Sequence, residues 1–205
     1  MRVHGVQDIL GTATGIAVGA VALVPLALLG IWALARLRIS AGAPPARAWR
    51  RSLAEVGLVY GTVPWVWMTM LPGNQAGLVT GAVSLEPFRD LETMSDIQVV
   101  GNLVLLSALG FFAPLRFRAL ASLPRIVVLA AFSSAAIETA QFVLRLDRVS
   151  SVDDVLLNTA GAAVAAVLSW PWWGPDSPDL PHPTTDRQTR ASSVCLDAGE
   201  VHSER

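Results

Sequence analysis

The sequence contains no lysine and only one cysteine, and charged residues of either sign are scarce. Only 15% of its 205 residues are charged, whereas a soluble domain carries about 25%. Cys195 has no second cysteine to pair with, which excludes an intrachain disulfide and a cysteine metal site. The net charge of −1 gives no sign of a nucleic-acid partner.

The sequence also has only three histidines, and none of them falls in an apolar segment. They are His4, His182 and His202. Histidine is the most frequent general acid or base near neutral pH. A catalytic histidine inside an apolar bundle is therefore excluded, and the sequence names no catalytic residue.

Apolar residues, in contrast, make up 53% of the chain, and the mean hydropathy is +0.51. A helix needs roughly 20 residues to cross the hydrocarbon core of a bilayer. Five segments come close to that length, and they run from about Gly11 to Leu37, Ser52 to Leu71, Ile97 to Leu115, Pro124 to Leu144 and Val152 to Trp172. The sequence therefore predicts an all-α integral membrane protein, a bundle of about five transmembrane helices.

Arginine residues gather in two of the loops between these segments. The first loop holds Arg36, Arg38, Arg47, Arg50 and Arg51, and the loop after the third segment holds Arg116, Arg118 and Arg125. Loops rich in basic residues stay in the cytoplasm. The acidic loop from Pro72 to Asp96 should then lie outside, although Arg145 and Arg148 in the next outer turn run against the rule. We expect a multi-pass protein of the cell inner membrane, with its N-terminus outside and its C-terminus cytoplasmic.

These features divide the chain into three parts. Residues 1–51 hold the first transmembrane helix and the arginine-rich cytoplasmic loop, and residues 52–170 form a helical domain. Residues 171–205 are rich in Pro, Asp, Ser and Thr and have no apolar period. Because such segments cannot bury a core, we expect a disordered cytoplasmic tail.

The stretch from Ile137 to Gly161 places polar residues inside apolar segments. Glu138 and Gln141 lie near the end of the fourth segment, and Asn158 lies near the start of the fifth. Side chains of this kind are expensive in hydrocarbon, so they need a structural or functional reason.

Asn102, Glu138 and Asn158 are expected at one depth. They stand about five, seven and six residues from the outer ends of their helices, which is roughly 7 to 10 Å of helix rise. Two explanations stay open: hydrogen bonds that hold the helices together, or a polar pocket open to the outer surface. An ionisable Glu138 near two aspartates and an arginine favours the pocket.

The pocket hypothesis assigns ligand binding to residues of three helices and two outer loops. They are Arg89, Asn102, Glu138, Gln141, Arg148, Asp153, Asp154 and Asn158. Asp153 and Asp154 have a second explanation, because carboxylates at the start of a helix interact favourably with its dipole. We assign no metal site and no cofactor to this pattern.

The same residues resemble the VanZ-like membrane protein family. The matching pieces are EPFRD at Glu86–Asp90, GNLVLLSALGF at Gly101–Phe111 and IETAQFVLRLDRVSSVDDVLLNTAGAAVAAVL at Ile137–Leu168, in the family's order and spacing. The resemblance covers about Tyr60 to Leu168, so residues 52–170 would be a VanZ-like helical domain. The characteristic positions carried over are Pro87, Phe88, Arg89, Asn102, Glu138, Gln141, Arg148, Asp153, Asp154, Asn158 and Gly161.

The resemblance implies a bacterial inner-membrane protein, and the founding type of the family lowers susceptibility to the glycopeptide antibiotic teicoplanin. We therefore expect action at the outer membrane–water interface on cell-envelope or lipid-linked components. The partners would be membrane lipids or a lipid-linked cell-wall component. Arg89 and Arg148 would bind phosphate, because guanidinium groups bind phosphate through paired hydrogen bonds. Ion pairs with Glu138 and the aspartates are the alternative role for these two arginines.

Two other functions stay open. The first is an integral-membrane enzyme, a metal-assisted hydrolase or transferase in which Glu138, Asp153 and Asp154 hold a divalent cation for a lipid-linked substrate. The second is a structural or partner-binding bundle that contacts a second copy of the chain or another membrane protein. The sequence does not decide whether the protein is an enzyme.

Overall fold

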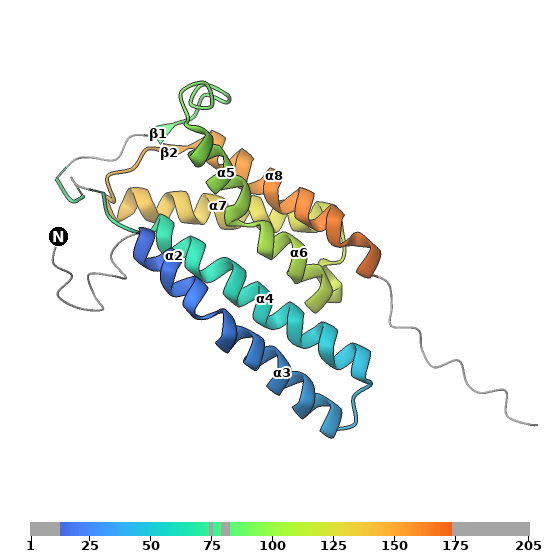
Figure 1. Cartoon of the computed structure of the whole chain (residues 1–205). Helices are drawn as coiled ribbons and strands as arrows, with labels where there is room; N and C mark the ends of the chain where they lie inside the picture. Colours follow the sequence, from blue (N-terminus) through green and yellow to red (C-terminus); the bar gives the residue numbers. More distant parts are fainter. Residues whose placement is uncertain (1–12, 74–75, 79–82, 174–205) are drawn as a thin grey trace, which may run out of the picture. The chain divides into compact units, whose positions relative to one another are not determined.

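The computed structural model describes residues 13–73, 76–78 and 83–173, most of them in helices (Figure 1). All of these residues belong to one unit, Met1–Gly174. The predicted tail lies outside the described residues from position 174 onward, and so do Cys195 and the three histidines.

The first predicted span is a broken helix rather than a single rod. Its two parts are α2, Ala13–Ala22, and α3, Val24–Ser40, and their axes differ by 41°. Pro25 lies in the first turn of α3. Proline has no N–H group, and its ring clashes with the carbonyl four residues earlier, here that of Val21, so the helix breaks at this point.

Five α-helices follow, of which α5 and α6 are short and consecutive. They are α4 (Pro45–Thr69), α5 (Asp96–Leu105), α6 (Ser107–Arg116), α7 (Leu123–Val143) and α8 (Val152–Ser169), with short 3-10 turns at η1 (Arg118–Leu120) and η2 (Trp170–Trp172). A capping box starts α5: the Gln98 N–H donates to the Ser95 hydroxyl, and the Ser95 N–H donates to the Gln98 side chain at 3.0 Å. These bonds satisfy N–H groups that the first turn leaves without partners, so they fix where the loop before α5 ends.

Three segments are long and apolar enough to cross a membrane: Asp96–Arg116, which joins α5 and α6, Leu123–Val143 and Val152–Trp172. The bent pair of α2 and α3 would make a fourth. The predicted second span lies in α4, which carries Glu55 and three arginines and does not meet the same test. The described residues therefore support three spans, or four with the bent pair, rather than the predicted five.

Large apolar side chains remain exposed on the outer faces of these helices. Phe132 on α7 is 78% exposed, and Leu26 on α3 and Val164 on α8 are similarly exposed. A bilayer needs no burial of such faces, because acyl chains are as apolar as the side chains that they contact. The exposed apolar faces agree with a helical membrane protein.

Helix α8 packs against α5, α6 and α7, and α4 packs against α3 and α6. Small residues such as Ala130, Ala162 and Ala166 fill much of the core, so the backbones lie close together. A Cβ atom built on Gly161 would lie only 2.6 Å from the Leu103 carbonyl carbon of α5. Glycine at this position is therefore required for the contact of α8 with α5.

The two strands among the described residues are β1, Val83–Ser84, and β2, Ser150–Ser151, which pair in parallel. Hydropathy gives no signal for them. Their pairing attaches the loop before α5 to the start of α8, as Figure 1 shows.

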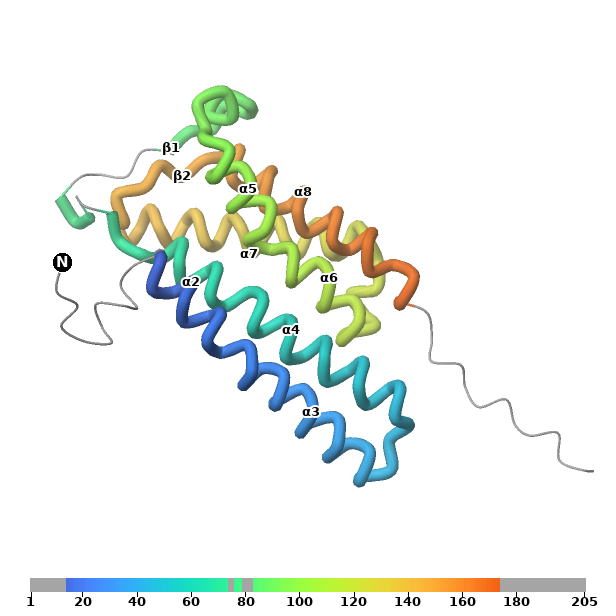
Figure 2. The backbone as a smooth tube through the Cα atoms, in the orientation of Figure 1, coloured from blue at the N-terminus to red at the C-terminus, as the bar shows by residue number. Residues whose placement is uncertain are grey.

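The directions of the helices define two ends of this unit. The last turns of α4 and α7 meet the first turns of α5 and α8 at one end, here called the loop end (Figure 2). The last turns of α3 and α6 and the first turns of α4 and α7 lie at the other, here called the arginine end.

Replacing Gly161 by alanine should destabilise the bundle, because the added methyl group would overlap the Leu103 backbone. Overpacking of this kind costs about 1–3 kcal/mol. Gly101→Ala is the matched control, since a Cβ atom there meets nothing within 4 Å. Thermal unfolding of the purified protein in detergent measures both variants, and equal midpoints would contradict the close approach of α5 and α8.

Candidate functional site

A cavity of about 490 Å³ opens at the loop end. Its walls come from α4, α5, α7 and α8 and from the loops before α5 and α8. The polar side chains that line it are Thr69, Asp90, Thr93, Gln98, Asn102, Glu138, Gln141, Asp147, Arg148, Ser151 and Asp154. A volume of this size lies in the range of small-ligand sites.

Helix α7 contributes Glu138 and Gln141, three residues apart and therefore on one face. Both side chains are buried. The Ser151 N–H donates to Glu138 Oε2 at 3.3 Å, and Gln141 Nε2 donates to the Thr69 carbonyl at 2.9 Å. These bonds join the last turns of α7 to the start of α8 and to the end of α4, so they fix this wall of the cavity.

Helices α5 and α8 meet at the cavity through Asn102 and Asp154. Asn102 Nδ2 donates to Asp154 Oδ1. Asp154 lies in the first turn of α8, where the helix dipole favours a carboxylate. Asn102 and Glu138, which the sequence predicts at one depth, both line the cavity.

Asp153 faces the loop before α5, and its side chain does not line the cavity. Its Oδ1 accepts the Phe88 N–H at 2.6 Å, and its Oδ2 accepts the N–H groups of Asp90 and Leu91 at 2.9 and 3.1 Å. Phe88 has a φ of +67°, a conformation that a bulky residue adopts only where its surroundings enforce it. A carboxylate with three N–H donors anchors this loop strongly.

Asp90 is a cavity residue that the sequence analysis did not single out. Ser151 Oγ donates to Asp90 Oδ2 at 2.6 Å. Hydrogen bonds from the hydroxyls of Ser151 and Ser84 lower the pKa of the Asp90 carboxyl below its ordinary value, because they stabilise the charged form. The signal was present in the sequence, since Asp90 ends the EPFRD motif.

Besides Asp153, two more of the eight predicted ligand-binding residues, Arg89 and Asn158, lie away from the cavity. Arg89 is exposed, and its Nη1 pairs with Glu86 Oε2 at 2.8 Å. Asn158 lies one turn beyond Asp154 and is 1% exposed, and its Nδ2 donates to Ser134 Oγ of α7 at 2.8 Å. Asn158 therefore forms a hydrogen bond between helices, which is the first of the two explanations that the sequence leaves open. The cavity is lined by the other predicted residues, Asn102, Glu138, Gln141, Arg148 and Asp154.

The cavity is acidic. Carboxylates of Asp90, Glu138, Asp147 and Asp154 line it, against the guanidinium of Arg148. Carboxylates accept hydrogen bonds from hydroxyl, amide and ammonium groups, and guanidinium binds phosphate or carboxylate. The arrangement can hold a ligand that carries several donors and one anionic group.

The metal-assisted alternative requires Glu138, Asp153 and Asp154 around one ion. Within the part of the chain that the structure describes, no group of three His, Cys, Asp or Glu side chains is placed to hold a metal. Asp153 is engaged by the N–H groups of the loop. The three-carboxylate ligand set therefore does not form in this structure.

A family model described as VanZ/LLP1 matches residues 58–173, more than half of the chain. The matched region contains every residue that lines the cavity, and it confirms the resemblance predicted over Tyr60–Leu168. No curated protein and no solved structure matches the chain.

Asp153→Ala should release the loop that carries Phe88 to Leu91 and leave the helices folded. Each hydrogen bond to a charged group contributes about 1.5–3 kcal/mol, so loss of three should speed trypsin cleavage after the exposed Arg89 by about tenfold or more. Glu92→Gln, on the same loop, is the control. Cleavage at the wild-type rate in the Asp153 variant would contradict the anchoring role.

The lowered pKa of Asp90 means that its charged form stabilises the folded state. A group whose pKa is lower in the folded state adds stability that is complete above its unfolded value of 3.8 and is lost as pH falls through the lower folded value. A ¹³C NMR titration of the Asp90 carboxyl should therefore give a midpoint below 3.8, and Ser151→Ala should move it upward. An unchanged midpoint in that variant would show that the Ser151 hydroxyl does not stabilise the charge.

Proposed function

The chain belongs to the VanZ/LLP1 family, and we propose that it acts at the outer membrane–water interface of the bacterial inner membrane. In this proposal the loop-end cavity binds a cell-envelope component, most specifically a lipid-linked cell-wall component. The single observation that supports it is the cavity of about 490 Å³, which carboxylates and amides from three helices line together with one arginine.

The chemistry of the cavity fits the head group of such a compound. Arg148 binds the phosphate that links lipid to sugar, because guanidinium pairs with phosphate oxygens. Asp90, Glu138 and Asp154 accept hydrogen bonds from sugar hydroxyls and peptide N–H groups. The sequence suggests that Arg89 and Arg148 both bind phosphate. The proposal keeps only Arg148 in that role, because Arg89 does not line the cavity and pairs with Glu86.

The charge of the two ends supports the proposed orientation. Arg38, Arg51 and Arg116 gather at the arginine end, and basic residues stay in the cytoplasm. In this proposal the loop end faces outward, with the N-terminus outside and the C-terminus cytoplasmic, which requires α4 to cross the bilayer as well. A protein that withdraws or shields a lipid-linked precursor at this surface would lower susceptibility to teicoplanin, whose target is in the cell wall.

Glu138→Gln and Asp154→Asn should each weaken ligand binding by about ten- to a hundredfold, because hydrogen bonds to a charged group contribute about 1.5–3 kcal/mol. Both variants keep the size of the side chain. The measurement is mass spectrometry of lipid-linked compounds that copurify with the full chain, together with the teicoplanin susceptibility of a sensitive host that expresses it.

Asp96→Asn is the matched control, since Asp96 starts α5 but does not line the cavity. Each variant must accumulate in the membrane at the wild-type level. Copurification that survives both cavity substitutions would contradict the proposed site. If the wild-type chain binds the lipid-linked compound without changing susceptibility, the teicoplanin part of the proposal fails and the binding part stands.

A further inference from the structure

An apolar groove of about 510 Å³ runs between α3 and α4. Leu26, Gly30 and Leu34 line it on the α3 side. On α4 the lining residues extend from Glu55 to Pro64, which is about 14 Å of helix. This length is about half of the hydrocarbon thickness of a bilayer, so the groove matches the depth of one leaflet.

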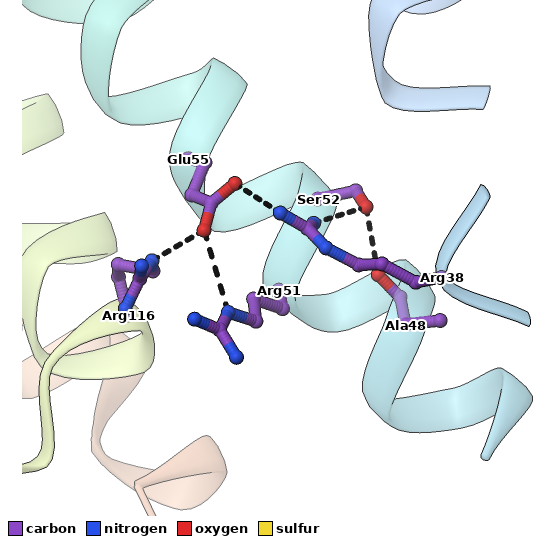
Figure 3. Close-up of polar contacts among 6 residues, drawn as sticks. All are labelled: Arg38, Ala48, Arg51, Ser52, Glu55 and Arg116. Carbon is purple, nitrogen blue, oxygen red and sulfur yellow. Dashed lines mark hydrogen bonds and ion pairs between the residues drawn. The ribbon is translucent and has the colours of Figure 1, made fainter. Parts of the chain in front are cut away.

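Three arginines surround Glu55 at one end of the groove, as Figure 3 shows. Arg38 comes from α3, where its Nη2 pairs with Glu55 Oε2. Arg116 comes from α6, and its Nε lies 2.5 Å from Glu55 Oε1. Arg51, one turn before Glu55 on α4, makes a longer contact of 3.4 Å with the same oxygen.

This cluster carries more positive charge than its carboxylate neutralises. Three guanidinium groups face one carboxylate, which leaves an excess of two positive charges. Arg38 is also held by Ser52 Oγ at 2.5 Å, and Ser52 is fully buried. Arg51 is the most exposed of the three, at 53% of its side-chain area. An anion that approaches Arg51 would therefore offset the repulsion among the arginines.

We infer that the groove and the arginine cluster form one binding site for an anionic phospholipid. One acyl chain lies along α3 and α4, and the phosphate binds Arg51, with Arg38 and Arg116 behind it. A zwitterionic phospholipid would bring its own cation to the cluster, and free phosphate would not use the groove. The site lies at the arginine end, so it does not depend on the function proposed for the loop-end cavity.

The test uses the full chain in detergent, with thermal unfolding followed during titration with phosphatidylglycerol or with phosphatidylcholine of the same acyl chains. Phosphatidylglycerol should raise the unfolding midpoint more than phosphatidylcholine does. Arg51→Gln should weaken the apparent affinity for phosphatidylglycerol about fivefold, the equivalent of about 1 kcal/mol for an arginine near an anionic surface. Arg125→Gln, at the same end but bonded to the Ala119 carbonyl rather than to Glu55, is the charge-matched control.

A second pair of variants tests the groove. Gly30→Leu should fill the groove and reduce the rise in unfolding midpoint that phosphatidylglycerol causes. Gly19→Leu, on α2 and outside the groove, should leave that rise unchanged. Neither substitution meets an atom within 4 Å of the new Cβ, so both chains should fold.

Four results would overturn the inference. They are equal effects of the two phospholipids, equal effects of the two arginine substitutions, equal effects of the two glycine substitutions, and a full midpoint shift with inorganic phosphate alone. The last result would assign the cluster to a free anion rather than to a lipid.

Discussion

The contact between Asp153 and the loop before α5 determines whether the cavity exists in its present form. Three loop N–H groups converge on this carboxylate at the start of α8. The same turn presents Ser151, which bonds both Glu138 and Asp90, and Asp154, which faces the cavity. If the loop moved away, Asp90 would leave the cavity and the wall between α5 and α8 would open. Asp153, whose side chain does not line the cavity, thus holds in place the loop and the helix turn that do.

The charge differs between the two ends of the unit. Inside the bundle the buried polar pair of Asn158 and Ser134 is neutral and joins α8 to α7. The charged side chains lie toward the ends, acidic at the loop end and basic around Glu55 at the arginine end. The two proposals differ accordingly: the cavity is proposed to bind hydroxyl and N–H donors together with one phosphate, and the cluster around Glu55 an anionic phospholipid.

Hydropathy and helix rise are regular, so the sequence predicts the apolar helices and a common depth for Asn102, Glu138 and Asn158. Asn102 and Glu138 line the cavity, and Asn158 does not. It does not predict which of two adjacent aspartates faces the cavity. Asp153 and Asp154 are about 100° apart around α8, and the N–H groups of a distant loop decide between them. The sequence also misses how far Pro25 bends the first span, because the angle depends on what the two halves pack against. The local sequence pattern therefore predicts where the helices lie and how deep a residue sits in them. The direction in which a side chain points depends on contacts with distant parts of the chain.

The central claim is that the loop-end cavity, and not the apolar surface in general, receives a cell-envelope ligand. A photoreactive amino acid placed at Thr93, which lines the cavity, tests this directly in living cells. The matched position is Val128, which is 67% exposed on the apolar face of α7. A crosslinked lipid-linked cell-wall compound is expected at position 93, and only bulk phospholipid at position 128. Identical adducts at the two positions, or no lipid-linked compound at position 93, would contradict the central claim.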